Sequence, residues 1–337
     1  MFQFLKRFVK YLLVIVLLTT CQTQTEKING VSFVAARDAI GAENVKPVVN
    51  LGANYAAIMP FGFIKNPEHP EIIHNTDRQW FGETKAGTKQ YIEQLSKQNI
   101  KIMIKPQIWV WRGEYTGDIK MTTEADWKTL ESFYTDFMMQ YVHLAIEVNA
   151  EIFCIGTELE EFVSARPEFW SNLIAEIKKV YHGKLTYAAN WDEYKRTPFW
   201  EELDFIGVDA YFPVSEMKTP TVVDCQEGWQ EHKVLLRTIS EEKGKPVLFT
   251  EFGYRSMDFN GIKPWNSDHT IETLNFEAQT NATQALFEEF WAEEWFAGGF
   301  IWKWYHDDAK SGGLENNQFT PQNKPVEELI KSYYRTP

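Results

Sequence analysis

The sequence Ile152-Phe153-Cys154-Ile155-Gly156-Thr157-Glu158 is a short apolar run that ends in a glutamate, and Val247-Leu248-Phe249-Thr250-Glu251 repeats this pattern later in the chain. Such runs are typical of strands that are buried on both faces of a parallel sheet. A carboxylate at the end of a buried strand is costly to desolvate unless hydrogen bonds or a function justify it. The two runs therefore indicate the kind of sheet and a pair of candidate functional acids.

Short β-rich runs and segments of helical period alternate along the rest of the chain. The β-rich runs lie at 30–35, 55–60, 101–106, 151–156, 185–189, 205–209, 247–250 and 299–302. The helical patterns lie at 84–98, where Thr84 is a candidate cap, and at 124–148, 170–181, 227–243 and 277–295. This alternation, without a glycine-rich linker, predicts an α/β fold, a single (β/α)8 TIM barrel. An open doubly wound sheet is the alternative, but residues 33–37 lack the Gly-x-Gly-x-x-Gly turn that it would want.

The N-terminal residues have the pattern of an export signal. Three basic residues within 1–10 precede the apolar run 11–18, which is too short to cross about 30 Å of hydrocarbon. Leu18-Thr19-Thr20-Cys21 resembles a bacterial lipobox, although Thr20 stands where a smaller residue usually precedes the cysteine. An ordinary signal peptide is the alternative.

From this pattern we expect a lipoprotein-type signal peptide at 1–20, lipidation at Cys21, a tether at 21–27 and a catalytic barrel at 28–337. The protein would then be exported and lipid-anchored to a bacterial membrane, at the periplasmic face or the cell surface. We expect no other contact with the membrane.

The composition narrows the class of protein. The formal net charge of −13 argues against a nucleic-acid partner, and the 13 Trp fit either a carbohydrate-binding surface or a large aromatic core. Three Cys give no even-numbered disulfide framework, and Cys154 is expected to be a buried thiol. The seven His are scattered without metal-ligand spacing. We therefore expect a monomer without a metal or a cofactor.

In a (β/α)8 barrel, the residues that follow the strands gather at one mouth. Glu158 and Glu251 follow strands four and seven, so they could approach each other there. Two such groups about 5 to 5.5 Å apart are what a retaining glycoside hydrolase needs. Other strand-end candidates for this mouth are Trp109, Trp111, Asn190, Trp191, Asp209, Tyr211, Trp302 and Trp304. Glu160 and Glu161 instead suit the positive end of a following helix.

Several motifs, taken in order, resemble glycoside hydrolase family 113, which contains β-1,4-mannan-degrading enzymes with (β/α)8 barrels. These motifs are Ile104-Lys105-Pro106, residues 153–159, residues 249–254, Gly299-Phe300-Ile301-Trp302-Lys303-Trp304 and residues 319–325. The resemblance implies that Glu158 is the acid/base, that Glu251 is the nucleophile and that Tyr211 bonds the nucleophile. It also implies that Trp302 stacks below the cleaved sugar.

One position departs from the pattern of the larger clan, which usually places Asn before the acid/base. The residue there is Thr157, so the contact to the substrate 2-hydroxyl must come from elsewhere, and Asn190 is the candidate.

These observations predict a retaining hydrolase of β-1,4-linked mannan or manno-oligosaccharides, of endo-mannanase or β-mannosidase type. The partner would be a β-linked polysaccharide or oligosaccharide. A catalytically silent glycan-binding lipoprotein with a Trp-lined cleft is one alternative, but a binder has no reason to keep both glutamates. A hydrolase active on β-glucan and a transglycosylase are the others, the latter because a sugar can intercept the same covalent intermediate.

Overall fold

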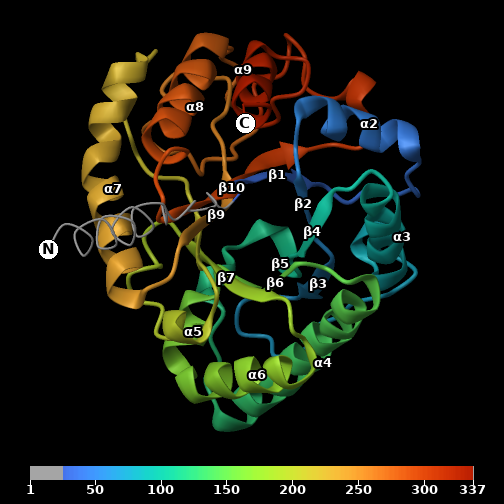
Figure 1. The fold of residues 1–337 in the computed structure, drawn as a ribbon. Helices are drawn as coiled ribbons and strands as arrows, with labels where there is room; N and C mark the ends of the chain where they lie inside the picture. Colours follow the sequence, from blue (N-terminus) through green and yellow to red (C-terminus); the bar gives the residue numbers. More distant parts are fainter. Residues whose placement is uncertain (1–25, 337) are drawn as a thin grey trace, which may run out of the picture.

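The computed structural model describes residues 26–336, so the expected signal peptide and Cys21 lie outside the described residues. Eight parallel strands close into a barrel in the order β1-β10-β9-β8-β7-β6-β4-β2 (Figure 1). The barrel strands are β1 (Ile28–Phe33), β2 (Tyr55–Ile58), β4 (Lys101–Ile104), β6 (Ile152–Thr157), β7 (Lys184–Asn190), β8 (Ile206–Asp209), β9 (Val247–Phe252) and β10 (Phe296–Trp304). The predicted (β/α)8 barrel is confirmed, and all eight expected runs contribute a strand.

Helices surround the barrel (Figure 1). They are α2 (Ala42–Leu51), α3 (Lys85–Ser96), α4 (Glu124–Val148), α5 (Glu160–Ala165), α6 (Pro167–Val180), α7 (Val222–Lys243), α8 (Phe276–Phe290) and α9 (Pro325–Tyr334). The expected cap of α3 is present, because the Thr84 side chain accepts a hydrogen bond from the backbone amide of Gly87. The sequence pattern did not indicate α2 or α9, which are each only ten residues long, and α2 contains Pro47.

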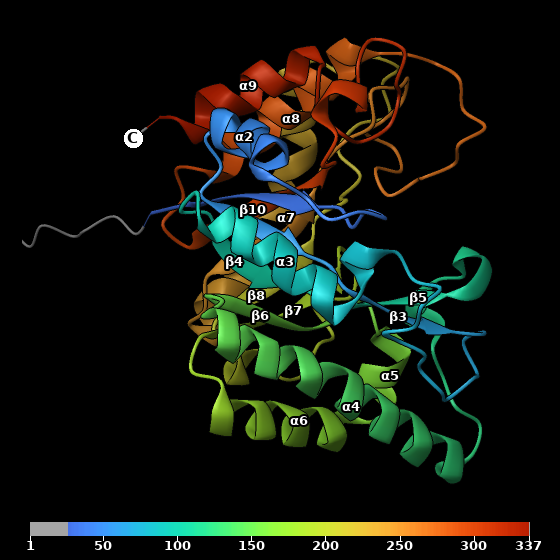
Figure 2. The same cartoon turned by 90° about the vertical axis from the view of Figure 1, so that its right-hand side faces the viewer.

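A second, two-stranded parallel sheet was not predicted. It pairs β3 (Phe61–Ile64) with β5 (Gln107–Val110) and extends past the carboxyl ends of the barrel strands (Figure 2). Pro60 and Pro106 each stand between a barrel strand and its extension. A proline has no amide hydrogen to donate to a neighbouring strand, so the barrel ladder ends there and the chains re-pair beyond it. This small sheet carries Gln107 and Trp109 beyond the end of the barrel.

The core has two parts. A small cluster of strand residues fills the barrel, and it includes Met103, Cys154, Leu248 and Phe300. A much larger cluster lies between the strands and the helices. Cys154 and Cys225 are both buried free thiols, so the expectation for Cys154 is confirmed.

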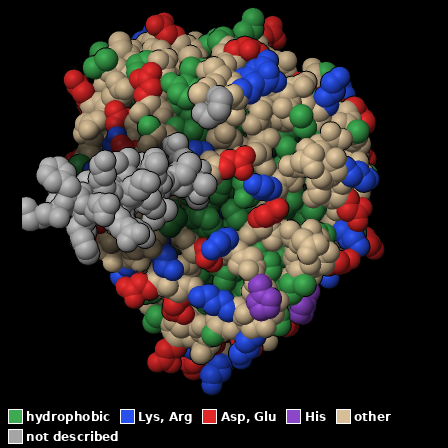
Figure 3. All heavy atoms as spheres, viewed as in Figure 1, with side chains coloured by type: hydrophobic (Ala, Val, Ile, Leu, Met, Phe, Trp, Pro, Cys, Tyr) green, Lys and Arg blue, Asp and Glu red, His purple; other side chains and the backbone are tan. Residues whose placement is uncertain are grey.

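The outer surface mixes charges of both signs. Figure 3 shows one face of the molecule, where acidic and basic side chains are interspersed around a central group of hydrophobic ones. Within residues 26–336, no helix is both long enough and apolar enough to cross a membrane.

Closure of the barrel depends on Gly298, where β10 pairs with Ile28 of β1. Gly298 has a φ of +119°, and an added Cβ would lie 2.3 Å from the carbonyl oxygen of Ile28. We expect Gly298→Ala to lower the free energy of unfolding by about 3 kcal/mol or more, because it combines backbone strain with a backbone clash. Urea unfolding followed by circular dichroism measures this loss.

Gly244 provides the matched control. It also has a positive φ, +61°, but nothing lies within 4 Å of its added Cβ. Gly244→Ala should therefore lower the free energy of unfolding only by the backbone strain, about 1 kcal/mol. Equal losses in the two variants would show that the close contact at the β1–β10 seam is not a constraint.

Candidate active site

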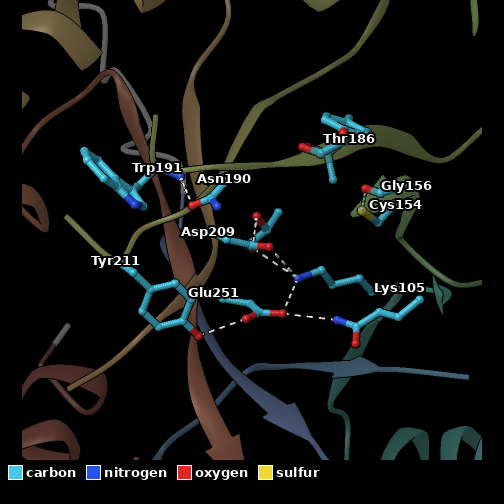
Figure 4. A network of polar contacts seen from close by, with 12 residues as sticks. Lys105, Cys154, Gly156, Thr186, Asn190, Trp191, Asp209, Tyr211 and Glu251 are labelled. Carbon is cyan, nitrogen blue, oxygen red and sulfur yellow. Dashed lines mark hydrogen bonds and ion pairs between the residues drawn. The ribbon is translucent and has the colours of Figure 1, made fainter. Parts of the chain in front are cut away.

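Glu251 lies in β9 at the mouth of the barrel, and three side chains donate hydrogen bonds to its carboxylate (Figure 4). Lys105 Nζ lies 2.5 Å and Gln107 Nε2 lies 3.1 Å from Oε1, while the Tyr211 hydroxyl lies 2.9 Å from Oε2. Donors of this kind favour the ionised form of a carboxyl group. The expected hydrogen bond from Tyr211 is present, and donors contact both oxygens of the Glu251 side chain.

Lys105 is completely buried between two acids from neighbouring strands. Its Nζ lies 3.1 Å from Asp209 Oδ1 in β8 and 2.5 Å from Glu251 Oε1. Burial alone would lower the pKa of Lys105, but the negative charges of Asp209 and Glu251 outweigh it and raise the pKa above its usual value. Lys105 is therefore a fixed positive charge beneath the mouth.

Asp209 does not line the mouth as expected. Only 1% of it is exposed, and its carboxylate accepts hydrogen bonds from Lys105 and from the Thr250 hydroxyl at 2.8 Å. The side chain is therefore enclosed by protein and occupied by these partners. The expectation that Asp209 binds substrate is corrected: it holds Lys105.

Glu158 follows β6 in a left-handed backbone conformation with a φ of +50°. Its amide donates to the carbonyl oxygen of Ala188 at 2.8 Å. Burial raises the pKa of the Glu158 carboxyl well above the usual value, and the charges of Asp209 and Glu251 raise it further, against the opposing effect of Lys105. The two candidate acids therefore have different surroundings: hydrogen-bond donors contact the Glu251 side chain, whereas Glu158 lies near the negative charges of Asp209 and Glu251.

The next two acids behave as expected for a helix start. Glu160 and Glu161 open α5 and form ion pairs with Arg196 at 2.5 Å and with Lys120 at 2.8 Å. Neither of these ion pairs involves Glu251.

Five of the expected strand-end aromatic and amide residues remain accessible around the barrel. Trp302 is partly exposed, and the Lys303 ammonium lies 5.2 Å from its ring centroid. Trp109 and Trp111 are 49% and 64% exposed on β5 and just after it. Trp191, after β7, stacks on Trp265 with ring centroids 5.3 Å apart.

The expectation for Trp304 is wrong. Its side chain is fully buried in the large cluster between strands and helices, so it cannot contact a sugar. The expectation assumed that side chains two positions apart in β10 share a face. The β1–β10 pairing shifts register between Val31 and Phe33, where Phe33 pairs with Trp304, so the alternation fails at this point.

Asn190 is engaged by the protein itself. Its Nδ2 donates to the Tyr115 hydroxyl at 2.7 Å, and its Oδ1 accepts from the amide of Trp191 at 2.7 Å. The hydroxyl of Thr157 is buried. A contact from Asn190 to the substrate 2-hydroxyl would have to use the remaining amide hydrogen or a changed rotamer.

Sequence reasoning assigned no role to Lys105, Gln107, Tyr115 or Glu193. A lysine directly after an apolar strand was the available signal for Lys105, whereas Gln107 is separated from that strand by a proline. Glu193 is 1% exposed, and burial raises its pKa to about 7. It lies in a polar loop, where nothing in the sequence marks it as buried.

The described residues contain no group of three or more His, Cys, Asp or Glu side chains that could hold a metal ion. The polar groups at the mouth are thus carboxyl groups, their hydrogen-bond donors and aromatic rings. Such a set suits proton transfer and nucleophilic attack at a sugar carbon.

Comparisons with solved structures find the same fold in known proteins. The chain resembles a solved GH113 β-mannanase from Alicyclobacillus acidocaldarius, AaManA, in complex with ManMIm, with a TM-score of 0.79, 23% identity, and coverage of 91% of this chain and 97% of that one. It also resembles a GH113 β-1,4-mannanase with a TM-score of 0.78 and 20% identity, over 93% of this chain and all of that one. A Faecalibacterium prausnitzii β-glucuronidase matches less closely, with a TM-score of 0.61, 13% identity, and coverage of 91% and 48% of the two chains.

No curated protein matches the sequence. The family model of Glycoside Hydrolase Family 113, however, matches residues 35–324, which is most of the chain and nearly all of the barrel. With the strand-end acids in the surroundings described above, this match identifies the chain as a member of glycoside hydrolase family 113.

Proposed function

We propose that this protein is a retaining β-1,4-mannan hydrolase in which Glu251 is the nucleophile and Glu158 is the acid/base. The observation that carries the proposal is the contrast between the two carboxyl groups. Three side chains donate hydrogen bonds to Glu251, whereas burial and neighbouring negative charge favour the protonated form of Glu158. Such a difference in surroundings assigns the acid and the nucleophile.

In the first step, a Glu251 oxygen forms a bond to the anomeric carbon as the bond to the leaving oxygen breaks. Glu158 donates its proton to that oxygen, so the leaving sugar departs as an alcohol. Glu251 loses its negative charge when it becomes an ester. Because that charge raised the pKa of Glu158, the pKa of Glu158 falls at this point.

In the second step, the ionised Glu158 takes a proton from water as the water oxygen attacks the same carbon. The ester bond breaks, Glu251 returns to a carboxylate, and Glu158 is protonated again. Two displacements at one carbon retain its configuration. Lys105 stabilises the carboxylate at the start and at the end of the cycle.

The similarity to two solved GH113 mannanases supports mannan as the substrate, and the exposed tryptophans Trp109 and Trp111 suit stacking on sugar rings. The same machinery would serve a β-glucan hydrolase or a transglycosylase. It argues against a silent glycan-binding protein, because a binder gains nothing from a buried lysine that contacts Glu251. Hydrolysis of mannan, with cellulose and xylan as comparisons, distinguishes these functions.

The N-terminal pattern supports a second, separate proposal, that the chain is exported and anchored through Cys21. A mature chain whose mass places its first residue elsewhere would contradict it.

Substitution of the two acids tests the assignment. Glu251→Ala should abolish hydrolysis of mannan and manno-oligosaccharides in a folded protein, because no covalent intermediate forms. Glu158→Ala should lower kcat/KM on the same substrates by about 10²- to 10⁴-fold, the usual contribution of a general acid. A reducing-sugar assay measures both losses.

Glu161→Gln is the control for this pair, because Glu161 lies in the same segment but pairs with Lys120 in a partly exposed ion pair. It should keep wild-type activity. Wild-type activity in Glu251→Ala would show that the nucleophile is another residue.

The pH dependence follows from the raised pKa of Glu158. A proton donor must be protonated, so kcat/KM falls as the pH rises through the pKa of Glu158 in the free enzyme. Because that pKa lies well above the ordinary value for glutamate, hydrolysis should persist at pH values where a solvent-exposed glutamate, with a pKa of about 4.3, is already ionised. Initial rates across a pH series measure the basic limb. A basic limb at the ordinary glutamate pKa would contradict the assignment.

A further inference from the structure

Glu193 is a buried acid close to the candidate proton donor, with both carboxylate oxygens engaged. Oε1 accepts a hydrogen bond from the Tyr187 hydroxyl at 2.6 Å, and Oε2 accepts one from the backbone amide of Asn190 at 2.9 Å. The backbone amide of Glu193 in turn donates to the carbonyl oxygen of Asn190 at 3.0 Å. Glu193 is thus tied to the end of β7 by its side chain and by its backbone.

The same acid reaches the end of β6 through Tyr187. The Tyr187 hydroxyl accepts a hydrogen bond from the backbone amide of Leu159 at 2.7 Å while it donates to Glu193. Leu159 directly follows Glu158. All of these groups are buried, so water does not compete strongly for the hydrogen bonds.

The backbone at Glu158 needs such support. Its φ of +50° is in the left-handed region, which costs a residue other than glycine roughly 1–2 kcal/mol. Two hydrogen bonds flank this residue: the Glu158 amide donates to Ala188, and the Leu159 amide donates to Tyr187. Both acceptors belong to β7, so the direction of the Glu158 side chain depends on how β7 is held.

We propose that Glu193 is a positioning residue for the proton donor: through Tyr187 and the Leu159 amide it fixes the backbone from which the Glu158 side chain projects. The inference rests on the proposed role of Glu158 as acid/base. Glu193 is almost inaccessible, so it acts through Glu158 rather than on the sugar.

The charges around Glu193 give this arrangement a second, electrostatic effect. Its negative charge contributes to raising the pKa of Glu158, and Glu160 and Asp209 act in the same direction on Glu193 itself. Tyr187 donates to it, while the Arg196 guanidinium is directed to Glu160. Removal of the Glu193 charge should therefore lower the pKa of Glu158.

Two variants test the arrangement. Tyr187→Phe removes the hydroxyl that joins Leu159 to Glu193 and keeps the ring in the core. Glu193→Gln removes the charge and keeps the volume. Tyr181→Phe is the matched control, because it too removes a hydroxyl that makes a buried hydrogen bond, here to the carbonyl oxygen of Ala150 at 2.7 Å, at the amino end of the barrel.

The measurement compares kcat/KM for two substrates, a dinitrophenyl β-mannoside and mannopentaose. Dinitrophenolate can leave without being protonated, whereas a sugar leaving group needs a proton. Only mannopentaose therefore needs a well-placed acid. Tyr187→Phe should lower kcat/KM for mannopentaose by about 10- to 100-fold, as expected for a displaced catalytic group, with less than about 3-fold change for the dinitrophenyl substrate. Glu193→Gln should move the basic limb of the mannopentaose pH profile to lower pH. Tyr181→Phe should change neither.

Other outcomes overturn the inference. Equal losses of kcat/KM on both substrates in Tyr187→Phe would mean that Tyr187 has a general structural role. No loss in Tyr187→Phe, together with an unmoved pH profile in Glu193→Gln, would mean that Glu193 does not position the proton donor. If Tyr187→Phe does not fold, the pH profile of Glu193→Gln decides by itself. A wild-type protein inactive on both mannosides would instead defeat the proposed function, so the two failures are distinguishable.

Discussion

The buried ion pairs of Lys105 with Asp209 and Glu251 are the interaction on which the mouth of this barrel depends. A lysine and two carboxylates removed from water lose hydration that only close, well-bonded partners can replace. Here the ammonium of Lys105 lies 3.1 Å from Asp209 and 2.5 Å from Glu251. Thr250 donates a further hydrogen bond to Asp209, and Gln107 and Tyr211 donate to Glu251. These ion pairs connect the carboxyl ends of β4, β8 and β9.

One positive charge between two negative ones gives the two catalytic candidates different surroundings. Glu251 receives the direct contact with Lys105, whereas Glu158 experiences the remaining negative charge of Asp209 and Glu251. The raised pKa of Glu158 therefore comes from burial and from these two acids, and Lys105 only partly offsets it. A glycan-binding surface would require no such difference.

The sequence was enough to predict the barrel and its two acids, because both depend on local patterns. Apolar strand runs alternate with helical periods, and Glu158 and Glu251 follow such runs directly. The two-stranded extension was missed because Pro60 and Pro106 look like strand ends, which they are for the barrel but not for the chain. Trp304 was misassigned because strand alternation was assumed to continue through a register shift.

Other features depend on contacts between distant segments. In the sequence, Glu193 has the pattern of a loop acid, and its contact with Tyr187 appears only when β6 and β7 lie side by side. Gln107 contacts Glu251 only because the small sheet places it there. A single sequence contains no signal for such long-range contacts. Lys105 is intermediate, since a charged residue after an apolar strand marks a special position but does not name its partners.

The covalent intermediate provides the most direct test of the account. A 2-deoxy-2-fluoro-β-mannosyl fluoride should react with the wild-type enzyme and leave a fluoromannosyl ester, because the fluorine slows the second displacement. Peptide mass spectrometry should place the added mass on Glu251, and Glu251→Gln should not be labelled. A label on another carboxylate, or the inverted anomer as the first product of manno-oligosaccharide hydrolysis, would contradict the central claim.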